Sequence, residues 1–564
     1  MTALPEIAAT EVVPPEDEVL FVTLGGVGEI GMNVALYGHA GKWLMVDLGV
    51  TFGDDTTPGV DLILPDLRFI EAQGGRLVGI VITHAHEDHV GAVPYFSKTF
   101  GCPVYTTPFT AAFLRRKLAE NGASGQMKIV EVPLGGSFKV GPFDLELVTM
   151  THSIPEPNGL VIRTPVGTLL HTGDWKIDPE PGVGAPPDTE KLAAIGDAGV
   201  LAMICDSTNA LIETPTRSEA DLRESLEKLI GECSGRAVFT CFASNIARMQ
   251  TIAAAAAANG RRVALVGRSL LRMNDVARET GYLKSTPPFL SEEHVGFLPR
   301  EEVVLMCTGS QGEPKAALSR IAFGTHPNVV LDPGDTVVYS SRTIPGNERS
   351  VDRVQDKLVH LGLDIITNRE RLVHVSGHPS RPELKQMYGW VRPRFAVPVH
   401  GELRHLHAHA ELARECGVEE ALLVENGVLL SFSQKGCQRL GKVPTGRLTP
   451  DGRNLSRLDG EALRARKRMA VNGSAMVSLV VGRDGALLAD PQISVRGLSE
   501  EIEEGRLQDA MADAVERAVT ALPGGRRQDD EAIRDAARSA LRRTLRNRYD
   551  KRPIVEVHVV RVGR

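Results

Sequence analysis

The segment VITHAHEDHVGAV, residues 81–93, concentrates side chains of the metal-ligand type. His84, His86, Asp88 and His89 fall within six positions, directly after a short run of strand-forming residues. His84 and His86 would point the same way in extended chain, whereas Asp88 and His89 lie beyond the strand end and can face a second position. Without a metal or exposure to water, several of these polar groups would be unsatisfied. The spacing therefore predicts a metal site in which one loop serves two ions.

Three further ligand candidates stand at the ends of other apolar runs: His152 in MTHSIPE, Asp174 in HTGDWK and His400 in VPVHGE. Each is a weak signal by itself, but a closed ligand set needs residues from distant parts of the chain. A set of imidazoles and carboxylates without cysteine favours zinc or manganese.

A glycine pattern near the N-terminus could instead indicate a dinucleotide-binding site. GGVGEIG contains Gly26, Gly28 and Gly31 in G-x-G-x-x-G spacing, and Asp47 follows at roughly the distance of a dinucleotide fingerprint. That fingerprint has to open a helix, whereas the following MNVALYG has the pattern of a strand. A tight turn near the site is therefore favoured over a nucleotide-binding fold.

The elements that must position these residues change in character along the chain. Residues 19–209 alternate short apolar strands with glycine turns, which predicts a β-rich unit with polar residues at strand ends. From residue 210 to about 382, strand and helix patterns alternate, which predicts a separate parallel-sheet domain. Gly, Pro and Asp accumulate in GKVPTGRLTPDGRNLS as in a linker, and a small α+β unit follows, with helices at 499–522 and 529–548.

Composition limits the class of protein. The 564 residues are 42% hydrophobic and 24% charged, as in a soluble globular protein of about three or four units. There is no apolar run near the roughly 18 residues that span a bilayer, and no signal-peptide pattern, so we expect a cytoplasmic protein without membrane contact. Seven scattered cysteines without C-x-x-C predict reduced core thiols. A net charge of −7 argues against a generally basic nucleic-acid coat, but a local groove can still be positive.

Two stretches with a helical pattern carry clustered histidines or arginines, and each allows a functional or a purely structural interpretation. In RHLHAHAE, His405 and His409 lie four apart and could bind metal as a pair, although surface or partly buried helix residues are favoured. The predicted helix 529–548 could contact RNA or a partner, although a solvated helix face is favoured. Its arginines are Arg534, Arg538, Arg542, Arg543, Arg546 and Arg548.

The order of these motifs resembles a known family. H-x-H-x-D-H, then His, then Gly-Asp is similar to the metallo-β-lactamase fold, and CDSTNA with Asp206, HVSGHPS with His378 and PVHGE with His400 resemble the extra motifs of β-CASP nucleases. Histidine in the last motif is similar to the RNA-cleaving members. TLGGVGEIGMN, HSIPE, CTGSQGEP and SSRTIPGNE resemble the ribonuclease J family, over about residues 18–455 in order.

The resemblance implies an α/β fold, a metallo-β-lactamase αββα sandwich with an inserted α/β β-CASP domain and a small C-terminal α+β domain. The implied limits are a disordered N-terminus at 1–17, the metallo-β-lactamase domain at 18–215 and 384–450, the β-CASP domain at 216–383, a linker at 451–467 and the C-terminal domain at 468–564.

Carried over to this sequence, the resemblance implies one zinc on His84, His86 and His152, and a second on Asp88, His89 and His400, with Asp174 bridging both. A hydroxide between two such metals ~3.5–4 Å apart would attack a phosphodiester. Asp47 and Asp206 would support the site from behind it, and the catalytic roles would fall to Asp174, His378 and Asp88. The implied RNA-phosphate contacts are His374, Ser376, Gly377, His378, Ser341 and Arg342, the last standing where the family more often has serine.

The function implied is a zinc-dependent ribonuclease, with manganese or magnesium as possible supporting ions. It would combine 5′-to-3′ exonuclease action on 5′-monophosphate RNA with endonuclease action on single strands, in mRNA decay and rRNA maturation. The implied assembly is a homodimer or homotetramer through the C-terminal domain, with an unidentified partner in an RNA-degrading complex. Two alternatives are a small-molecule hydrolase on the same metal core, which should lack the insertion, and a silent RNA-binding scaffold, which should have lost ligands.

Overall fold

The computed structural model describes residues 4–54, 56–498 and 506–563. The chain divides into two compact units: Met1–Phe52 with Leu62–Gly446, and Gly53–Asp61 with Arg447–Arg564. Among the described residues, none of the helices combines the length and apolarity needed to cross a membrane.

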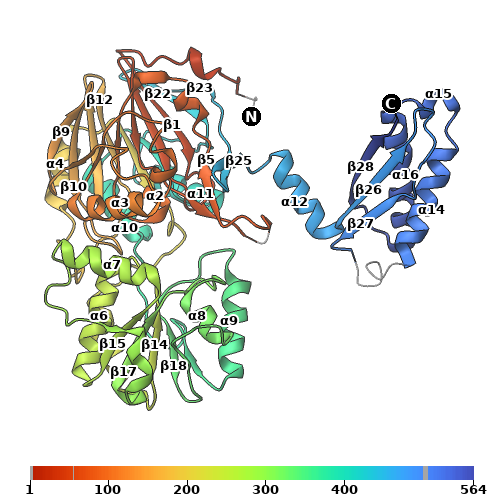
Figure 1. The fold of residues 1–564 in the computed structure, drawn as a ribbon. Helices are drawn as coiled ribbons and strands as arrows, with labels where there is room; N and C mark the ends of the chain where they lie inside the picture. Colours follow the sequence, from red (N-terminus) through yellow and green to blue (C-terminus); the bar gives the residue numbers. More distant parts are fainter. Residues whose placement is uncertain (1–3, 55, 499–505, 564) are drawn as a thin grey trace. The chain divides into compact units, whose positions relative to one another are not determined.

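The first unit contains two sheets packed face to face (Figure 1). The first sheet has the order β23-β22-β1-β2-β3-β6-β7-β8, and its strands are β1 Val19–Gly25, β2 Val34–His39, β3 Lys42–Val46, β6 Leu77–Val81, β7 Val104–Thr106, β8 Ile129–Glu131, β22 Val428–Ser433 and β23 Gly436–Lys442. The second has the order β21-β20-β13-β12-β11-β10-β9, and its strands are β9 Ser137–Val140, β10 Phe143–Thr149, β11 Asn158–Thr164, β12 Gly167–His171, β13 Ala202–Asp206, β20 Phe395–Val399 and β21 Glu420–Ala421. A short antiparallel pair, β4 Thr51–Phe52 and β5 Leu62–Pro65, lies outside both sheets.

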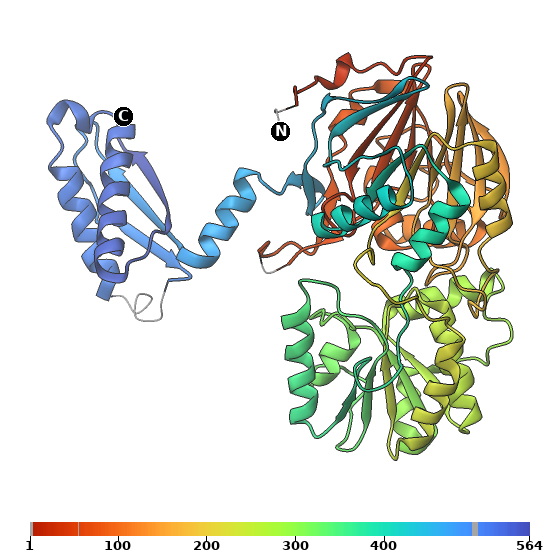
Figure 2. The ribbon, with the colours of Figure 1, turned by 180° about the vertical axis from the view of Figure 1, so that it is seen from behind.

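Apolar residues of both sheets interdigitate in one buried core, for example Phe21 and Leu430 with Leu145 and Ile204. The other face of the second sheet packs on α4 Thr189–Ala198, α10 Arg381–Val391 and α11 Leu403–Glu415, seen from behind in Figure 2. On the side of the first sheet lie α1 Arg68–Glu71, α2 Glu87–Val90 and α3 Pro108–Glu120, and Trp43 of β3 meets Phe69 of α1 edge to face. The layers are therefore helix, sheet, sheet, helix, which confirms the predicted αββα sandwich.

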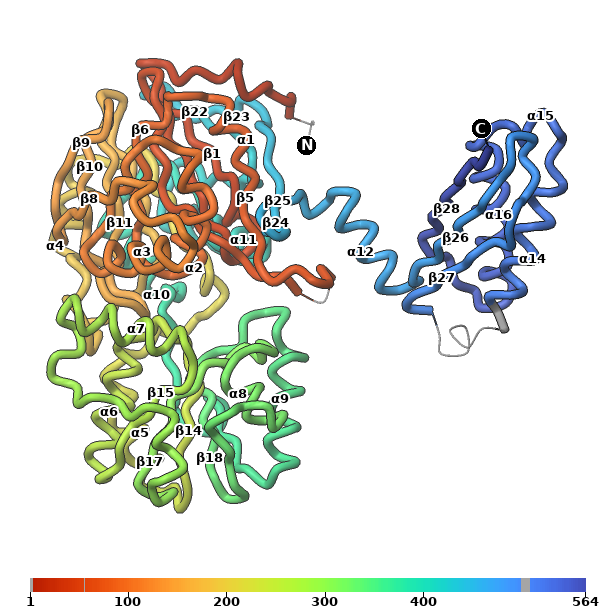
Figure 3. Tube along the Cα trace, viewed as in Figure 1, coloured from red at the N-terminus to blue at the C-terminus, as the bar shows by residue number. Residues whose placement is uncertain are grey.

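An inserted domain interrupts the sandwich between β13 and β20. The Cα trace leaves the two sheets in yellow and returns in teal (Figure 3). The six strands of its parallel sheet have the order β16-β15-β17-β14-β18-β19: β14 Ala237–Thr240, β15 Arg262–Val266, β16 Leu290–Ser291, β17 Val303–Cys307, β18 Thr336–Tyr339 and β19 Asp364–Ile366. Its helices are α5 Asp221–Glu232, α6 Ile246–Ala258, α7 Arg268–Glu279, α8 Ala317–Ala322 and α9 Glu348–His360. The alternation of strand and helix patterns predicted this parallel sheet.

The second unit has its own sheet and core. Strands β26 Ser474–Val481, β27 Gln492–Arg496 and β28 Ile554–Arg561 pack on α14 Arg506–Thr520 and α16 Asp530–Tyr549, beside the short α15 Gly524–Arg527. The helix predicted at 499–522 begins outside the described residues. The segment predicted as a linker contains β25 Asn454–Arg457, paired with β24 Arg447–Asp451, and the start of α12 Glu461–Asn472. The helix formers of EALRARKRMAVN account for α12.

Residues 4–17, the described part of the segment predicted to be disordered, form contacts with the rest of the chain. Ile7 donates its backbone N–H to Lys442 O, and Lys442 N donates to Pro5 O. Val12 is buried. An edge strand with free backbone groups can order an adjoining segment in this way, which composition alone does not reveal.

Candidate metal centre

The HAHEDH segment forms the loop after β6 and the single turn of α2. Backbone bonds fix this turn against neighbouring loops: Asn33 N donates to Asp88 O and Val50 N to Glu87 O. The approach is so close that a Cβ at Gly49 would lie 1.6 Å from Asp88 O. Glycine at position 49 is therefore required for α2 to reach its place.

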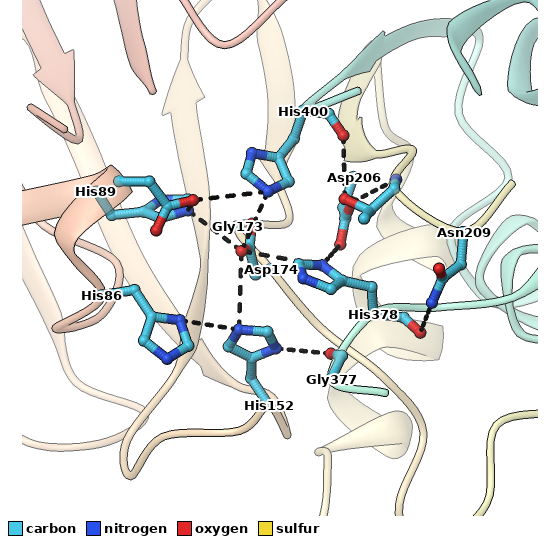
Figure 4. A network of polar contacts seen from close by, with 12 residues as sticks. His86, His89, His152, Gly173, Asp174, Asp206, Asn209, Gly377, His378 and His400 are labelled. Atoms are coloured by element: carbon cyan, nitrogen blue, oxygen red, sulfur yellow. Dashed lines mark hydrogen bonds and ion pairs between the residues drawn. The ribbon is translucent and has the colours of Figure 1, made fainter. Parts of the chain in front are cut away.

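Seven side chains from four strand ends converge into two groups. His84, His86, His152 and Asp174 form one, and Asp88, His89, Asp174 and His400 form the other, with the ligand atoms of each group within 4.8 Å of one another. Figure 4 shows His86, His89, His152 and His400 around Asp174. Asp174 is shared: its Oδ2 lies 3.2 Å from His89 Nε2, 3.5 Å from His400 Nε2, 3.7 Å from His152 Nε2 and 3.9 Å from His84 Nε2.

Hydrogen bonds on the outer side of the rings set their tautomers. His152 Nδ1 donates to Gly377 O at 2.6 Å, His89 Nδ1 to Asp47 Oδ2 at 2.7 Å and His400 Nδ1 to Asn33 Oδ1 at 2.8 Å. Because each acceptor is an oxygen, the proton resides on Nδ1 and the lone pair of Nε2 faces the centre. Outer hydrogen bonds of this kind orient the histidine ligands of metals.

His84 is oriented by one more step. The Thr83 hydroxyl donates to Asp47 Oδ2 at 2.9 Å, so it can only accept from His84 Nδ1, which is also 2.9 Å away. His84 Nε2 then lies with its lone pair 3.1 Å from His86 Nδ1, and His152 Nε2 is 3.0 Å from the same atom. The Nε2 atoms of His84 and His152 therefore both face His86 Nδ1, an arrangement that a cation between the three nitrogens would stabilise.

The electrostatics of the two groups also fit cations. Burial, and then the neighbouring imidazoles, hold the pKa of His84 and His152 well below the usual range, and burial lowers the pKa of His86 to about 4. Burial also lowers the pKa of His89, but Asp174, Asp88 and Asp47 outweigh it and raise that pKa well above the usual range. The rings of His84, His86 and His152 thus favour the neutral form, and the carboxylates of Asp88 and Asp174 favour a positive charge beside them, which together fit the binding of divalent cations.

A further imidazole stands beside the two groups without belonging to the metal ligands proposed above. His378 Nδ1 donates to Asp206 Oδ2 at 2.8 Å and is 3.9 Å from Asp174 Oδ2. Burial lowers the pKa of His378, but the Asp206 carboxylate outweighs it and raises that pKa to about 9. Asp206 is itself held by the N–H and hydroxyl of Thr208, and that hydroxyl also reaches His400 O at 3.1 Å.

Comparison with known proteins agrees with this geometry. The Sinorhizobium meliloti protein named Ribonuclease J is 44% identical over 97% of this chain and 98% of its own length. Proteins of the same name from Mycolicibacterium smegmatis and Thermus thermophilus are 40% and 36% identical, over 96% of this chain and 96% and 95% of their own lengths. The chain belongs to the ribonuclease J family.

Four family models each match a different segment of the chain. Residues 27–231 match the metallo-β-lactamase superfamily, 234–358 the ribonuclease J β-CASP domain, 362–423 the Zn-dependent metallo-hydrolase RNA specificity domain and 461–562 the ribonuclease J C-terminal domain. A solved structure of a protein of unknown function from Enterococcus faecalis is similar in fold, with TM-score 0.51 and 17% identity over 74% of this chain and 100% of that chain. The fold and the ligand groups together indicate a centre for divalent metal ions.

In this ribonuclease J family member, the return segment of the insertion completes the centre. A Cβ at Gly377 would lie 2.7 Å from both Cε1 and Nδ1 of His152, so only glycine lets this loop reach the ring. Asn209 Nδ2 donates to Ser376 Oγ at 2.8 Å and to His378 O at 3.0 Å, while Arg342 Nη1 donates to Asn209 Oδ1 at 3.0 Å. The predicted phosphate-contact residues on two loops are thus tied together through Asn209.

Two of those residues carry buried polar atoms that no described residue satisfies: His374 Nδ1 and Ser341 Oγ. Burial, and then the charges of Arg248, Lys176 and Arg342, hold the pKa of His374 well below its usual range. The surroundings of the neutral ring are therefore positive, as an anion would require.

Sequence reasoning missed the residues that hold these loops. Arg248 of α6 is fully buried; it forks onto Glu219 at 2.7 and 3.1 Å and reaches Ser340 O at 2.8 Å and Val373 O at 3.3 Å. The available signal was a lone charge in the apolar stretch NIARMQTIAAAAAANG. Asn33 was missed too, although it ends the motif TLGGVGEIGMN.

The structure also decides between the alternatives given above for the His405–His409 pair and for the glycine pattern at residues 25–31. His409 is buried between Ser207 Oγ at 2.8 Å and Tyr388 OH at 2.9 Å, so it is a hydrogen-bonded core residue and His405 is not its partner. The glycine pattern makes a turn beside the centre: Gly26 has φ 86°, and its carbonyl accepts His400 N at 2.7 Å. A strand, β2, follows it.

Proposed function

We propose that this chain hydrolyses phosphodiester bonds of single-stranded RNA, with two zinc ions held by the two ligand groups. His84, His86 and His152 would hold one ion, Asp88, His89 and His400 the other, and Asp174 would bridge them. The observation that carries the proposal is the sharing of Asp174 between two buried groups beside the His378–Asp206 pair. When bound, the metals supply Lewis acidity and an activated water for an in-line displacement.

The chain's own residues supply orientation and a proton. Asp206 fixes His378 through Nδ1 and stabilises its charged form, so the other ring nitrogen is the one that can donate to the leaving oxygen. Asp47 accepts hydrogen bonds from the backbone N–H and hydroxyl of Thr83 and from His89 Nδ1, which fixes the orientation of the hydroxyl and the Nδ1–H tautomer of His89. These positions are set before substrate arrives, which lowers the reorganisation required in the transition state.

The positive surroundings of His374 support a site for a terminal 5′-phosphate. Its unsatisfied Nδ1 and Ser341 Oγ could donate to or accept from such a group, and Arg342 could pair with its charge. His374 and His378 lie on the same loop, and Gly377 of that loop contacts His152. A terminal phosphate held near His374 would therefore place the adjoining phosphodiester near His378. The proposal is therefore 5′-to-3′ exonuclease action with a preference for 5′-monophosphate, alongside endonuclease action when no end is bound.

The remaining expectations extend this proposal. We propose domain limits of 18–215 and 384–450 for the sandwich and 216–383 for the insertion, self-association through residues 468–564, and roles in mRNA decay and rRNA maturation. Light scattering of the full chain and of a chain ending at residue 450 would test the assembly.

The first experiment is degradation of one RNA carrying 5′-monophosphate, 5′-triphosphate or 5′-hydroxyl, beside DNA of the same sequence. We expect mononucleotides fastest from the monophosphate, loss of activity and of bound zinc in His84→Ala and Asp174→Ala, and no effect of His407→Ala, an exposed histidine on α11. His378→Ala should lose about 10²–10⁴ in rate and keep its zinc. Cleavage of DNA or of a small ester with RNA left intact would favour another hydrolase of this fold, and RNA binding without any cleavage would favour a silent scaffold.

A further inference from the structure

The last three turns of α16 carry an unbalanced positive charge. Arg542, Arg543 and Arg546 are exposed, and Arg546 lies four and three residues after the adjacent Arg542 and Arg543, so the three lie on the side of α16 that is turned away from its buried Leu541 and Leu545. Arg548, Lys551 and Arg552 follow directly in the sequence, against a single acid, Asp550. We call Arg542, Arg543, Arg546 and Arg548 the α16 arginine cluster.

The first half of the same helix differs in its pairing. Arg534 forms an ion pair with Glu531 at 2.9 Å and Arg538 one with Asp535 at 2.7 Å, each three residues away. Within the described part of the chain, none of the four cluster arginines forms an ion pair or a side-chain hydrogen bond. Repulsion between the like charges at positions 542 and 546 costs the helix a few tenths of a kcal/mol, which offsets part of the favourable interaction of Arg546 and Arg548 with the C-terminal end of the helix dipole.

Two hydrogen bonds hold the segment that follows α16 against the end of α12. Lys551 Nζ donates to Val471 O at 3.1 Å, and Arg552 N donates to Asn472 Oδ1 at 3.1 Å, which joins the end of α16 to the end of α12. α12 itself carries exposed Arg464, Lys467 and Arg468. Among the described residues, positive charge therefore gathers around the joined ends of α12 and α16, in a chain whose net charge is −7.

We propose that the α16 arginine cluster is a second RNA-binding surface, which binds the phosphate backbone of single-stranded RNA outside the metal centre. Unpaired guanidinium groups on an ordered helix bind phosphate oxygens without reading sequence. Counter-ions released from the RNA then supply the free energy, so binding depends steeply on salt. This inference rests on the proposed function for its ligand, because RNA is the polyanion that the metal centre would act on.

The test compares two double variants with the same chemistry and spacing. Arg542→Gln with Arg546→Gln removes cluster arginines, while Arg534→Gln with Arg538→Gln removes ion-paired ones on the same helix; both change the net charge equally. Each is made in the full chain carrying Asp174→Asn, so that RNA stays intact, and binding of a fluorescent single-stranded RNA of about 30 nucleotides is measured by anisotropy at several salt concentrations.

If both cluster arginines contact phosphates, the slope of log Kd against log salt falls by about 1.4, or about sevenfold in Kd over a fourfold rise in salt. Adding Arg543→Gln and Arg548→Gln should extend the change toward about 3 in slope. The control variant, Arg534→Gln with Arg538→Gln, should show the same slope of log Kd against log salt as the chain that carries only Asp174→Asn. Circular dichroism and thermal unfolding establish that both variants keep the helix.

Equal slopes in the two double variants would overturn the inference. A change of oligomeric state in the cluster variant with an unchanged slope would also overturn it and assign the surface to a second copy of the chain. Degradation of RNA by the chain with Asp174 intact tests the proposed function separately. Degradation with equal slopes rejects only the second surface, and different slopes without degradation reject only the ribonuclease activity.

Discussion

Gly377→Ala adds one methyl group at the point where the insertion meets the metal centre. Its Cβ would lie 2.7 Å from two atoms of the His152 ring, closer than carbon atoms approach one another in folded proteins. The ring cannot rotate away freely, because its Nδ1 is bonded to Gly377 O at 2.6 Å and its Nε2 faces His86. Either the loop or the ring has to move, and both movements weaken the orientation of His152.

The size of the effect follows from the position of Gly377 behind a metal ligand. Loss of an outer partner of a metal-ligating histidine typically costs 10–100-fold in metal affinity or activity, about 1.4–2.7 kcal/mol. We therefore expect Gly377→Ala to release zinc at a correspondingly lower concentration of a competing chelator and to lose RNA hydrolysis in parallel. Metal per chain is measured by mass spectrometry of the protein after equilibration with the chelator.

Gly389→Ala is the matched control. Gly389 lies in α10, and a Cβ there meets nothing within 4 Å, so alanine should be neutral or stabilise the helix by up to about 1 kcal/mol. Equal zinc affinity and equal rate for Gly377→Ala and Gly389→Ala would refute the reasoning, because the steric contact with His152 would then have no consequence.

Three other predictions concern stability. Arg248→Met leaves Glu219 buried without its partner and should cost about 3–5 kcal/mol in denaturant unfolding, whereas the exposed Arg223→Met should cost little. Burial lowers the pKa of His409 to about 4 from the usual 6.5, so between these values the unfolded chain binds one more proton. Stability should therefore fall as pH drops from about 6.5 toward 4, by up to about 3 kcal/mol, and His409→Gln, unlike the exposed His407→Gln, should flatten this dependence. Removal of the metals by a chelator should lower Tm, and added zinc should restore it, because ions that bind only the folded chain stabilise it by mass action.

The ligand types and the layered fold were accessible from the sequence because each depends on local pattern. The spacing of His84 and His86 predicts a metal site, and the alternation of strand and helix patterns after Asn209 predicts a parallel sheet. The outer partners depend instead on tertiary approach: Asn33 behind His400, and Gly377 behind His152, lie 367 and 225 positions away along the chain. No local pattern reports such pairs. The predicted disorder of the N-terminal segment differs from the structure for a related reason, because residues 5–7 pair with the edge of β23, which lies far away along the chain.

The position of Gly377 also bears on what the insertion contributes. Strands β12, β13 and β20 run parallel, so their carboxyl ends meet at one edge of the sheet and deliver Asp174, Asp206 and His400 together. The sandwich thereby supplies ligands without help from the insertion. His152, however, takes its tautomer from the Gly377 carbonyl, and His378 follows in the next position. Because the same return segment orients His152, a proposed metal ligand, and positions the proposed proton donor, we expect metal binding and substrate cleavage to depend on each other. A change in the insertion that moves this segment should therefore alter metal affinity as well as the choice of substrate, because His152 would lose its hydrogen bond to Gly377 O.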